Sequence, residues 1–179
     1  MLPLVASVLA GWIALGATTQ GRPDLSGQWA TEADAPTSPS GGAPPQSRGD
    51  AGSGWGSPIA ITQDGRQFVV EYAPFTRYDM QRPLRLEYAL DGAETRNAMM
   101  IGHSAEQSRS RAKWIGTVLE ITTSHEARHP VTGAPLTTEV IQRLSLSPAG
   151  ELVVETTRTV AGAAPLTTRT TYKKSTPLR

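Results

Sequence analysis

Apolar and polar residues alternate along most of the chain after Ser57, in short segments rich in Val, Ile, Thr and Tyr. A period of two is typical of β-strands that bury one face and expose the other, and helical periodicity is absent throughout. The pattern therefore predicts an all-β chain of ten strands, at 25–31, 58–63, 66–73, 84–90, 94–101, 105–114, 117–126, 136–146, 151–160 and 166–174.

The connections between these strands alternate between short and long. Short turns with Gly, which supplies the positive φ of tight hairpins, are expected at 63–66, 91–92, 114–117 and 147–150. Longer connections are expected at 32–57, 74–83, 102–104, 127–135 and 161–165. In an antiparallel up-and-down meander, successive connections lie at opposite ends, so the tight turns share one end. Closure into a barrel removes the two exposed sheet edges, and we expect an open mouth formed by the longer loops.

Strand alternation also predicts which side chains fill the interior of the barrel. The inward positions are those whose apolar side chains share one face of each strand. We expect them at Leu84, Leu86, Tyr88, Leu119, Ile121, Leu144, Leu146, Leu152, Val154 and Tyr172.

Two segments fall outside this pattern. Residues 2–17 are uncharged and apolar, and the segment is too short for a membrane span. Because it contains a small-x-small cleavage site at 14–16, residues 1–21 are predicted to be a signal peptide. An uncleaved N-terminal anchor is the alternative. Residues 32–57 are rich in Gly, Pro, Ser and Ala and are predicted to be a disordered insertion, with Trp55 either docked on the domain or free. Residues 22–179 then form a single domain, periplasmic or extracellular, with no further membrane span.

Composition narrows the chemistry. The chain has 179 residues, 17 Lys plus Arg and 16 Asp plus Glu, so the formal charge of +1 predicts no nucleic-acid partner. With no cysteine, disulfides, thiolate catalysis and Cys-ligated zinc are excluded. No nucleophile elbow, phosphate-binding loop, dinucleotide fingerprint or paired-carboxylate motif is present. We therefore expect no cofactor, no enzymatic activity and a monomer.

The segment Asp24-Leu25-Ser26-Gly27-Gln28-Trp29 resembles the G-x-W signature that opens lipocalin-like barrels. Further segments, at 59–65, 88–92, 112–116, 144–147 and 171–174, resemble secreted bacterial lipocalin-like domains in the same order along the chain. The resemblance implies an antiparallel calycin-type barrel with Gly27, Trp29 and Trp114 as its structural signature. It also implies a basic residue late in the barrel that covers Trp29, for which Arg158 and Arg169 are the candidates, and a lumen for a small apolar molecule.

One short motif points to different chemistry. His125-Glu126-Ala127-Arg128-His129 matches the H-E-x-x-H signature of zinc proteases, which depends on a helix to place both imidazoles on one face. Here a β-branched strand leads into the motif, and Pro130 disfavours helix at His129. The interpretations are a frayed hairpin with solvated side chains, an accidental metal site, and, most remotely, a metal-dependent hydrolase. We predict no metal site.

The predicted strand at 105–114 places Arg109, Arg111 and Lys113 on one face. If Trp114 points inward, this basic stripe, with Arg96, is a solvated exterior facing acids such as Glu120. In the inverted register the stripe would line the lumen and select a carboxylate or a phosphate.

Aromatic residues cluster at the expected mouth, where they either close over a ligand or cap the core. The predicted ligand-binding residues are Tyr72, Phe75, Tyr78, Tyr88 and His103. The sequence thus predicts an exported barrel that binds a small hydrophobic or amphipathic molecule. The alternative is a non-enzymatic structural or interaction module of the cell envelope, whose barrel is filled by its own side chains.

Overall fold

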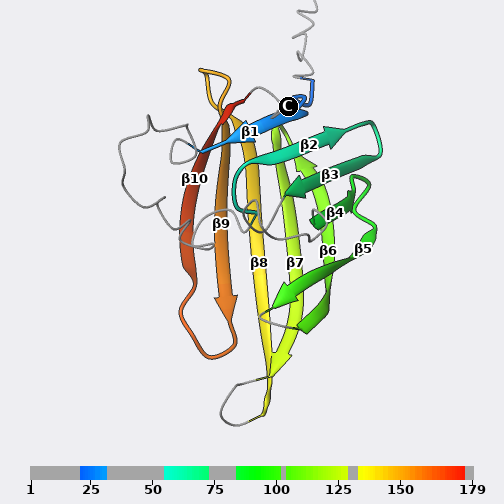
Figure 1. Cartoon of the computed structure of the whole chain (residues 1–179), viewed down its shortest axis with the longest axis vertical. Helices are drawn as coiled ribbons and strands as arrows, with labels where there is room; N and C mark the ends of the chain where they lie inside the picture. The colour runs from blue at the N-terminus through cyan, green and yellow to red at the C-terminus, as the bar shows by residue number, and fades with distance from the viewer. Residues whose placement is uncertain (1–20, 32–54, 73–83, 102–103, 129–132, 176–179) are drawn as a thin grey trace, which may run out of the picture.

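The computed structural model describes residues 21–31, 55–72, 84–101, 104–128 and 133–175, and all secondary structure in them is β-strand. Ten strands form, and each begins and ends within two residues of its predicted bounds (Figure 1). They are β1 (Gly27–Ala30), β2 (Ile59–Gln63), β3 (Gln67–Tyr72), β4 (Leu84–Ala89), β5 (Glu94–Ile101), β6 (Ser104–Ile115), β7 (Val118–Arg128), β8 (Pro135–Leu146), β9 (Leu152–Val160) and β10 (Leu166–Lys174).

The strands form one antiparallel sheet in the order β4-β3-β2-β1-β10-β9-β8-β7-β6-β5. Pairing of β1 with β10 joins the two halves of the chain and curls the sheet into a nearly closed barrel (Figure 1). Consecutive strands run in opposite directions, so the predicted up-and-down meander is confirmed. Gly116 and Gly150 occupy left-handed conformations in two of the tight turns, with φ of 60° and 78°.

The barrel has one seam, between β4 and β5, where no backbone ladder forms although the strands lie side by side. The side chain of Asn97 bridges this seam. The backbone N–H of Glu87 donates to Asn97 Oδ1 at 2.7 Å, and Asn97 Nδ2 donates to the carbonyl oxygen of Glu87 at 3.0 Å. The buried Asn97 amide thus replaces a peptide group of a neighbouring strand, and it hydrogen-bonds both the N–H and the C=O of Glu87.

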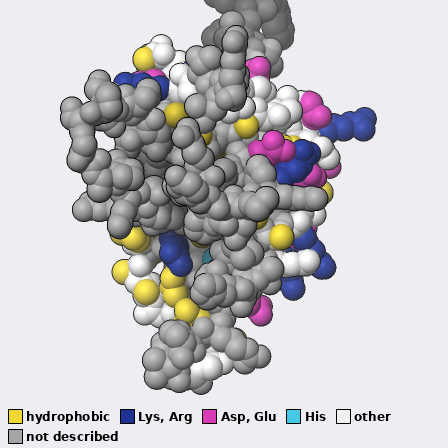
Figure 2. All heavy atoms as spheres, viewed as in Figure 1, with side chains coloured by type: hydrophobic (Ala, Val, Ile, Leu, Met, Phe, Trp, Pro, Cys, Tyr) yellow, Lys and Arg dark blue, Asp and Glu magenta, His cyan; other side chains and the backbone are white. Residues whose placement is uncertain are grey.

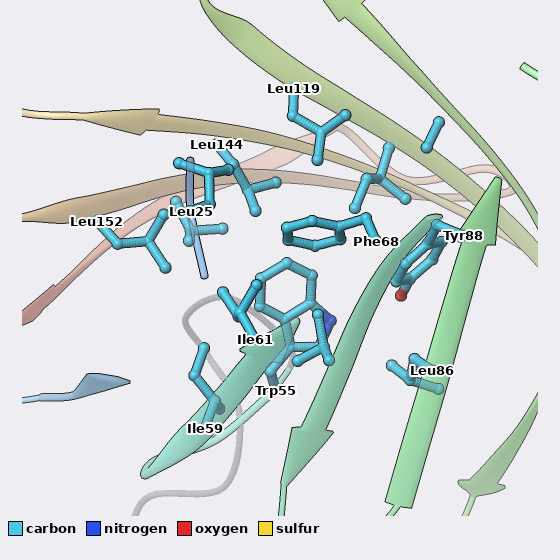
Figure 3. Packing of buried hydrophobic residues seen from close by; sticks show 14 of the residues in the cluster. Leu25, Trp55, Ile59, Ile61, Phe68, Leu86, Tyr88, Leu119, Leu144 and Leu152 are labelled. Atoms are coloured by element: carbon cyan, nitrogen blue, oxygen red, sulfur yellow. The ribbon is translucent and has the colours of Figure 1, made fainter. Parts of the chain in front are cut away.

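The apolar core lies inside the barrel at the end occupied by β1. Strand alternation predicted it well: Leu86, Tyr88, Leu119, Ile121, Leu144, Leu152, Val154 and Tyr172 are buried in one cluster, Leu146 packs against the cluster, and Leu84 is half-buried. Trp55 docks in the same cluster, 2% exposed, with its indole beside Phe68 and Tyr88 (Figure 3). Of the two alternatives for Trp55, docking on the domain is confirmed, and residues 32–54 of the predicted insertion lie outside the described residues.

The basic stripe lies outside the barrel, because Ser108, Ser110 and Ala112 between its members are buried. Arg111 pairs with Glu94 at 3.3 Å, and Lys113 pairs with Glu120 at 3.3 Å. Acidic and basic side chains gather on the right-hand side of the view in Figure 2. The Arg111–Glu94 pair is exposed on both sides and contributes little stability, whereas the Glu120 side chain is only 11% exposed. A search of the described ranges for helices with the length and hydropathy of a membrane span found none.

Candidate functional site

The inner face of the barrel changes character along β6–β9. Toward β1 it carries apolar residues, and toward the opposite end it carries hydroxyl, amide and imidazole groups. We call these inward polar residues the polar wall. Its members, all buried, are Ser108, Ser110, Thr123, His125, Thr138, Gln142 and Thr156.

Strand register places the polar wall directly against the apolar core. One row across the sheet runs from Ile121 through Gln142 and Thr156 to Thr168. Leu119, Leu144 and Val154 form the row on the core side. The interior therefore has an apolar floor and, one row further along the strands, a polar wall.

The hydroxyl groups of the polar wall differ in their partners. Ser110 Oγ and Thr123 Oγ1 share a hydrogen bond of 2.9 Å, and Ser108 Oγ donates to the carbonyl oxygen of Asn97 at 3.3 Å. Thr156 Oγ1 is buried and has no hydrogen-bond partner among the described residues. A buried hydroxyl without a partner costs free energy, so Thr156 marks a place where a polar group of another molecule would be stabilised.

The opposite end of the interior is built around Trp29, which is fully buried. Its indole N–H donates to the carbonyl oxygen of Leu25 at 2.9 Å, and Lys174 Nζ lies 5.4 Å from the ring centroid, a cation–π contact. Gly27 has φ of 142°, a conformation that side chains disfavour. These contacts close this end of the barrel.

The cation over Trp29 is Lys174, so the expectation of Arg158 or Arg169 was wrong. The reason is the register between the first and last strands, which places Trp29 opposite Lys174. Arg158 and Arg169 lie further along the β9–β10 hairpin, beyond the reach of β1. Trp114, the third predicted signature residue, is partly buried and packs against the same core.

The predicted ligand-binding residues are divided between the core and undescribed segments. Tyr88 is 3% exposed and packs on Phe68 with ring centroids 6.2 Å apart. The Trp55 side chain hydrogen-bonds its hydroxyl, and burial, the larger effect, raises the pKa of Tyr88. Tyr72 is partly buried against the same cluster. The structure thus brings Tyr72 and Tyr88 together in the apolar floor, and Phe75, Tyr78 and His103 lie outside the described residues.

The H-E-x-x-H motif does not form a helix. His125 and Glu126 belong to β7, so their side chains point to opposite faces: His125 is buried in the polar wall and Glu126 is exposed outside. His129 lies outside the described residues. Within the described ranges no cluster of three His, Asp or Glu side chains is arranged to hold a metal ion. The zinc-protease geometry needs two imidazoles on one face of a helix, and the β7 strand at His125 does not provide that helix.

A shallow polar hollow of about 260 Å³ lies over β6 and β7. It is lined by Gln107, Arg109, Ser124, His125 and Glu126, most of which are outward-facing. His125 is the lining residue that the hollow shares with the polar wall, and the other four lining residues face outward.

Comparison of the chain with protein-family models, with curated proteins and with solved structures found no match.

Proposed function

We propose that this chain is an exported lipocalin-like barrel that binds a small amphipathic molecule inside its polar end. The observation that carries the proposal is the polar wall, a set of buried hydroxyl, amide and imidazole groups placed beside an apolar floor. Burying a polar group lowers the stability of the fold unless the group is hydrogen-bonded. A binding site, in contrast, needs a few convergent polar groups on an apolar surface.

The filled core favours an amphipathic ligand over a purely hydrophobic one. The predicted inward residues of the apolar floor pack against one another and against Trp55 (Figure 3). An apolar molecule has no room among these side chains. A ligand that enters the polar end would meet the polar wall where it adjoins the floor, including the buried Thr156 hydroxyl.

The same filled core supports a second candidate function. A barrel packed by its own side chains is a rigid scaffold, as a structural or interaction module of the cell envelope requires. Such a module would carry no small molecule, and its polar wall would serve only to hydrogen-bond neighbouring strands, as Ser108 and Ser110 do.

Native mass spectrometry of the full chain taken directly from its host distinguishes the two functions. The binding proposal predicts a co-purifying small molecule that is released by organic solvent. A solvent-sensitive mass shift in the host-derived protein supports the proposal, and a bare protein mass supports the structural module.

A fluorescence titration with phenylnaphthylamine, a neutral aromatic dye with one N–H group, tests the location of the site. Thr168 faces inward beside Thr156, and Thr167 faces outward on the same strand. Thr168→Phe is expected to fill the polar end and abolish dye binding, whereas Thr167→Phe adds the same ring outside and leaves binding unchanged. Equal binding by both variants would place the dye elsewhere and contradict the proposed site.

A further inference from the structure

The acidic residues of the barrel strands lie on the outer face, which also carries basic residues. Every strand acid with a described side chain is at an outward position; these acids are Glu71, Glu87, Glu94, Glu120, Glu126, Glu139 and Glu155. On the inner face the strand residues with a permanent positive charge and a described side chain are Arg158 and Lys174. Lys174 covers Trp29 at the closed end, so Arg158 is the inward arginine of the polar end.

Arg158 is exposed and lies next to the polar wall, at the rim of the barrel. It follows Thr156 by two residues on β9, so the two side chains share the inner face. Its neighbours across the sheet are Val140 on β8 and Leu166 on β10. None of the ion pairs between described residues includes Arg158. On the outer face Arg85, Arg111 and Arg143 each have a glutamate partner, and Arg96, Arg109 and Arg169 have none among the described residues.

Leu166 adds an independent observation at the same place. It lies opposite Arg158 on the inner face and is 62% exposed, the most accessible large hydrophobic residue among the described residues. An unpaired guanidinium beside an accessible leucine and an unpartnered threonine hydroxyl provides a charge, an apolar surface and a hydrogen-bonding group together. Carboxylates, sulfonates and phosphates match a guanidinium through charge-assisted hydrogen bonds.

We propose that the ligand of the barrel carries an anionic head group, held at the rim by Arg158 and Thr156, with its apolar part on Leu166 and the floor. This inference rests on the proposed function, since it names the class of molecule that the polar end takes. The outward acids leave the described inner surface without a negative charge to repel such a ligand. Binding of this ligand would be non-covalent.

Two dyes with the same ring system test the inference: anilinonaphthalene sulfonate, which is anionic, and phenylnaphthylamine, which is neutral. The full chain is expected to bind the anionic dye about tenfold more tightly than the neutral one, because one charge-assisted hydrogen bond increases affinity by at least about this factor. Raising the salt concentration should weaken the anionic dye alone.

Arg158→Gln is expected to remove about tenfold in affinity for the anionic dye and to leave the neutral dye unchanged. Arg169→Gln, on the neighbouring strand but at an outward, exposed position, is the matched control and should change neither. Equal binding of both dyes, unchanged by Arg158→Gln, would overturn the anionic head group while leaving the binding function intact. Failure of both dyes to bind the full chain would contradict the binding function itself, and the inference with it.

Discussion

The two ends of the barrel interior are built from the same strands but from different side chains. At the β1 end, Trp29, Phe68 and Leu144 are fully buried and belong to one apolar cluster. At the other end, the same inner face carries Thr123, Thr156 and their polar neighbours. Apolar packing stabilises the fold, whereas buried hydroxyl groups return little stability even when paired. The difference assigns stability to the β1 end, and our proposal assigns recognition to the other end.

The largest effect is expected at Trp29. Trp29→Ala would leave a cavity and remove both the hydrogen bond to Leu25 and the ring under Lys174, so the free energy of unfolding should fall by about 3–5 kcal/mol. Urea denaturation measures the loss. Trp114→Ala removes the same ring from a partly buried position and should cost distinctly less. Equal losses would show that the β1 end is not the centre of stability.

The next effect is expected at the seam between β4 and β5. Asn97→Ala removes both hydrogen bonds to Glu87 and should lower the free energy of unfolding by about 1–3 kcal/mol. Amide hydrogen exchange should accelerate in β4 and β5 before it does in β7 and β8, which pair along their whole length. Uniform acceleration over all strands would mean that Asn97 supports the barrel as a whole and does not act as a local closure of the seam.

Alkaline pH should weaken the apolar end through Tyr88. Because burial raises its pKa above the ordinary value of 10.0, the folded state holds the phenolic proton more strongly than the unfolded state does. Below pH 10 this proton has no effect, and above it the free energy of unfolding should fall by up to about 1.4 kcal/mol per pH unit. Denaturation of the parent chain and of Tyr88→Phe between pH 9 and pH 11 measures the effect. If the two curves run parallel, Tyr88 does not titrate from a buried site.

The smallest effects are expected in the polar wall, and they have opposite signs. Thr123→Val breaks the hydrogen bond with Ser110 and should cost about 1 kcal/mol. Thr156→Val removes a buried hydroxyl without a partner and should leave stability unchanged or raise it by up to about 1 kcal/mol. Thermal unfolding of both variants provides the comparison. A large loss in Thr156→Val would show that its hydroxyl is structural.

The sequence predicted the strands and the apolar floor because both depend on local alternation. Leu119, Ile121 and Leu144 are inward simply because their strands have a period of two. The polar wall was not recognised, since Thr and Ser suit both faces of a strand, and Thr123 cannot be told from Thr122 by composition. The one available signal was parity: Ser108 and Ser110 alternate with the basic stripe and must therefore face inward.

Contacts between distant strands could not be predicted. Lys174 lies over Trp29 because the chain closes with β1 against the far end of β10, a register that neither segment specifies alone. Asn97 acquires its role from the seam, which depends on how the whole sheet curls. Trp55 stands alone among Gly, Pro and Ser residues, so its docking against Phe68 and Tyr88 appears only once the core exists.

The most direct test of the division between the two ends is methyl NMR of the full chain, labelled at threonine and leucine methyl groups, during titration with phenylnaphthylamine. We predict shift changes at Thr156, Thr168 and Leu166 on the inner face of the polar end. The outward Thr157 and Thr167, which hydrogen-bond each other at 2.9 Å, should stay unchanged, as should Leu144 in the floor's interior. Shifts confined to the outward threonines, or spread evenly over both faces, would contradict a binding site inside the barrel.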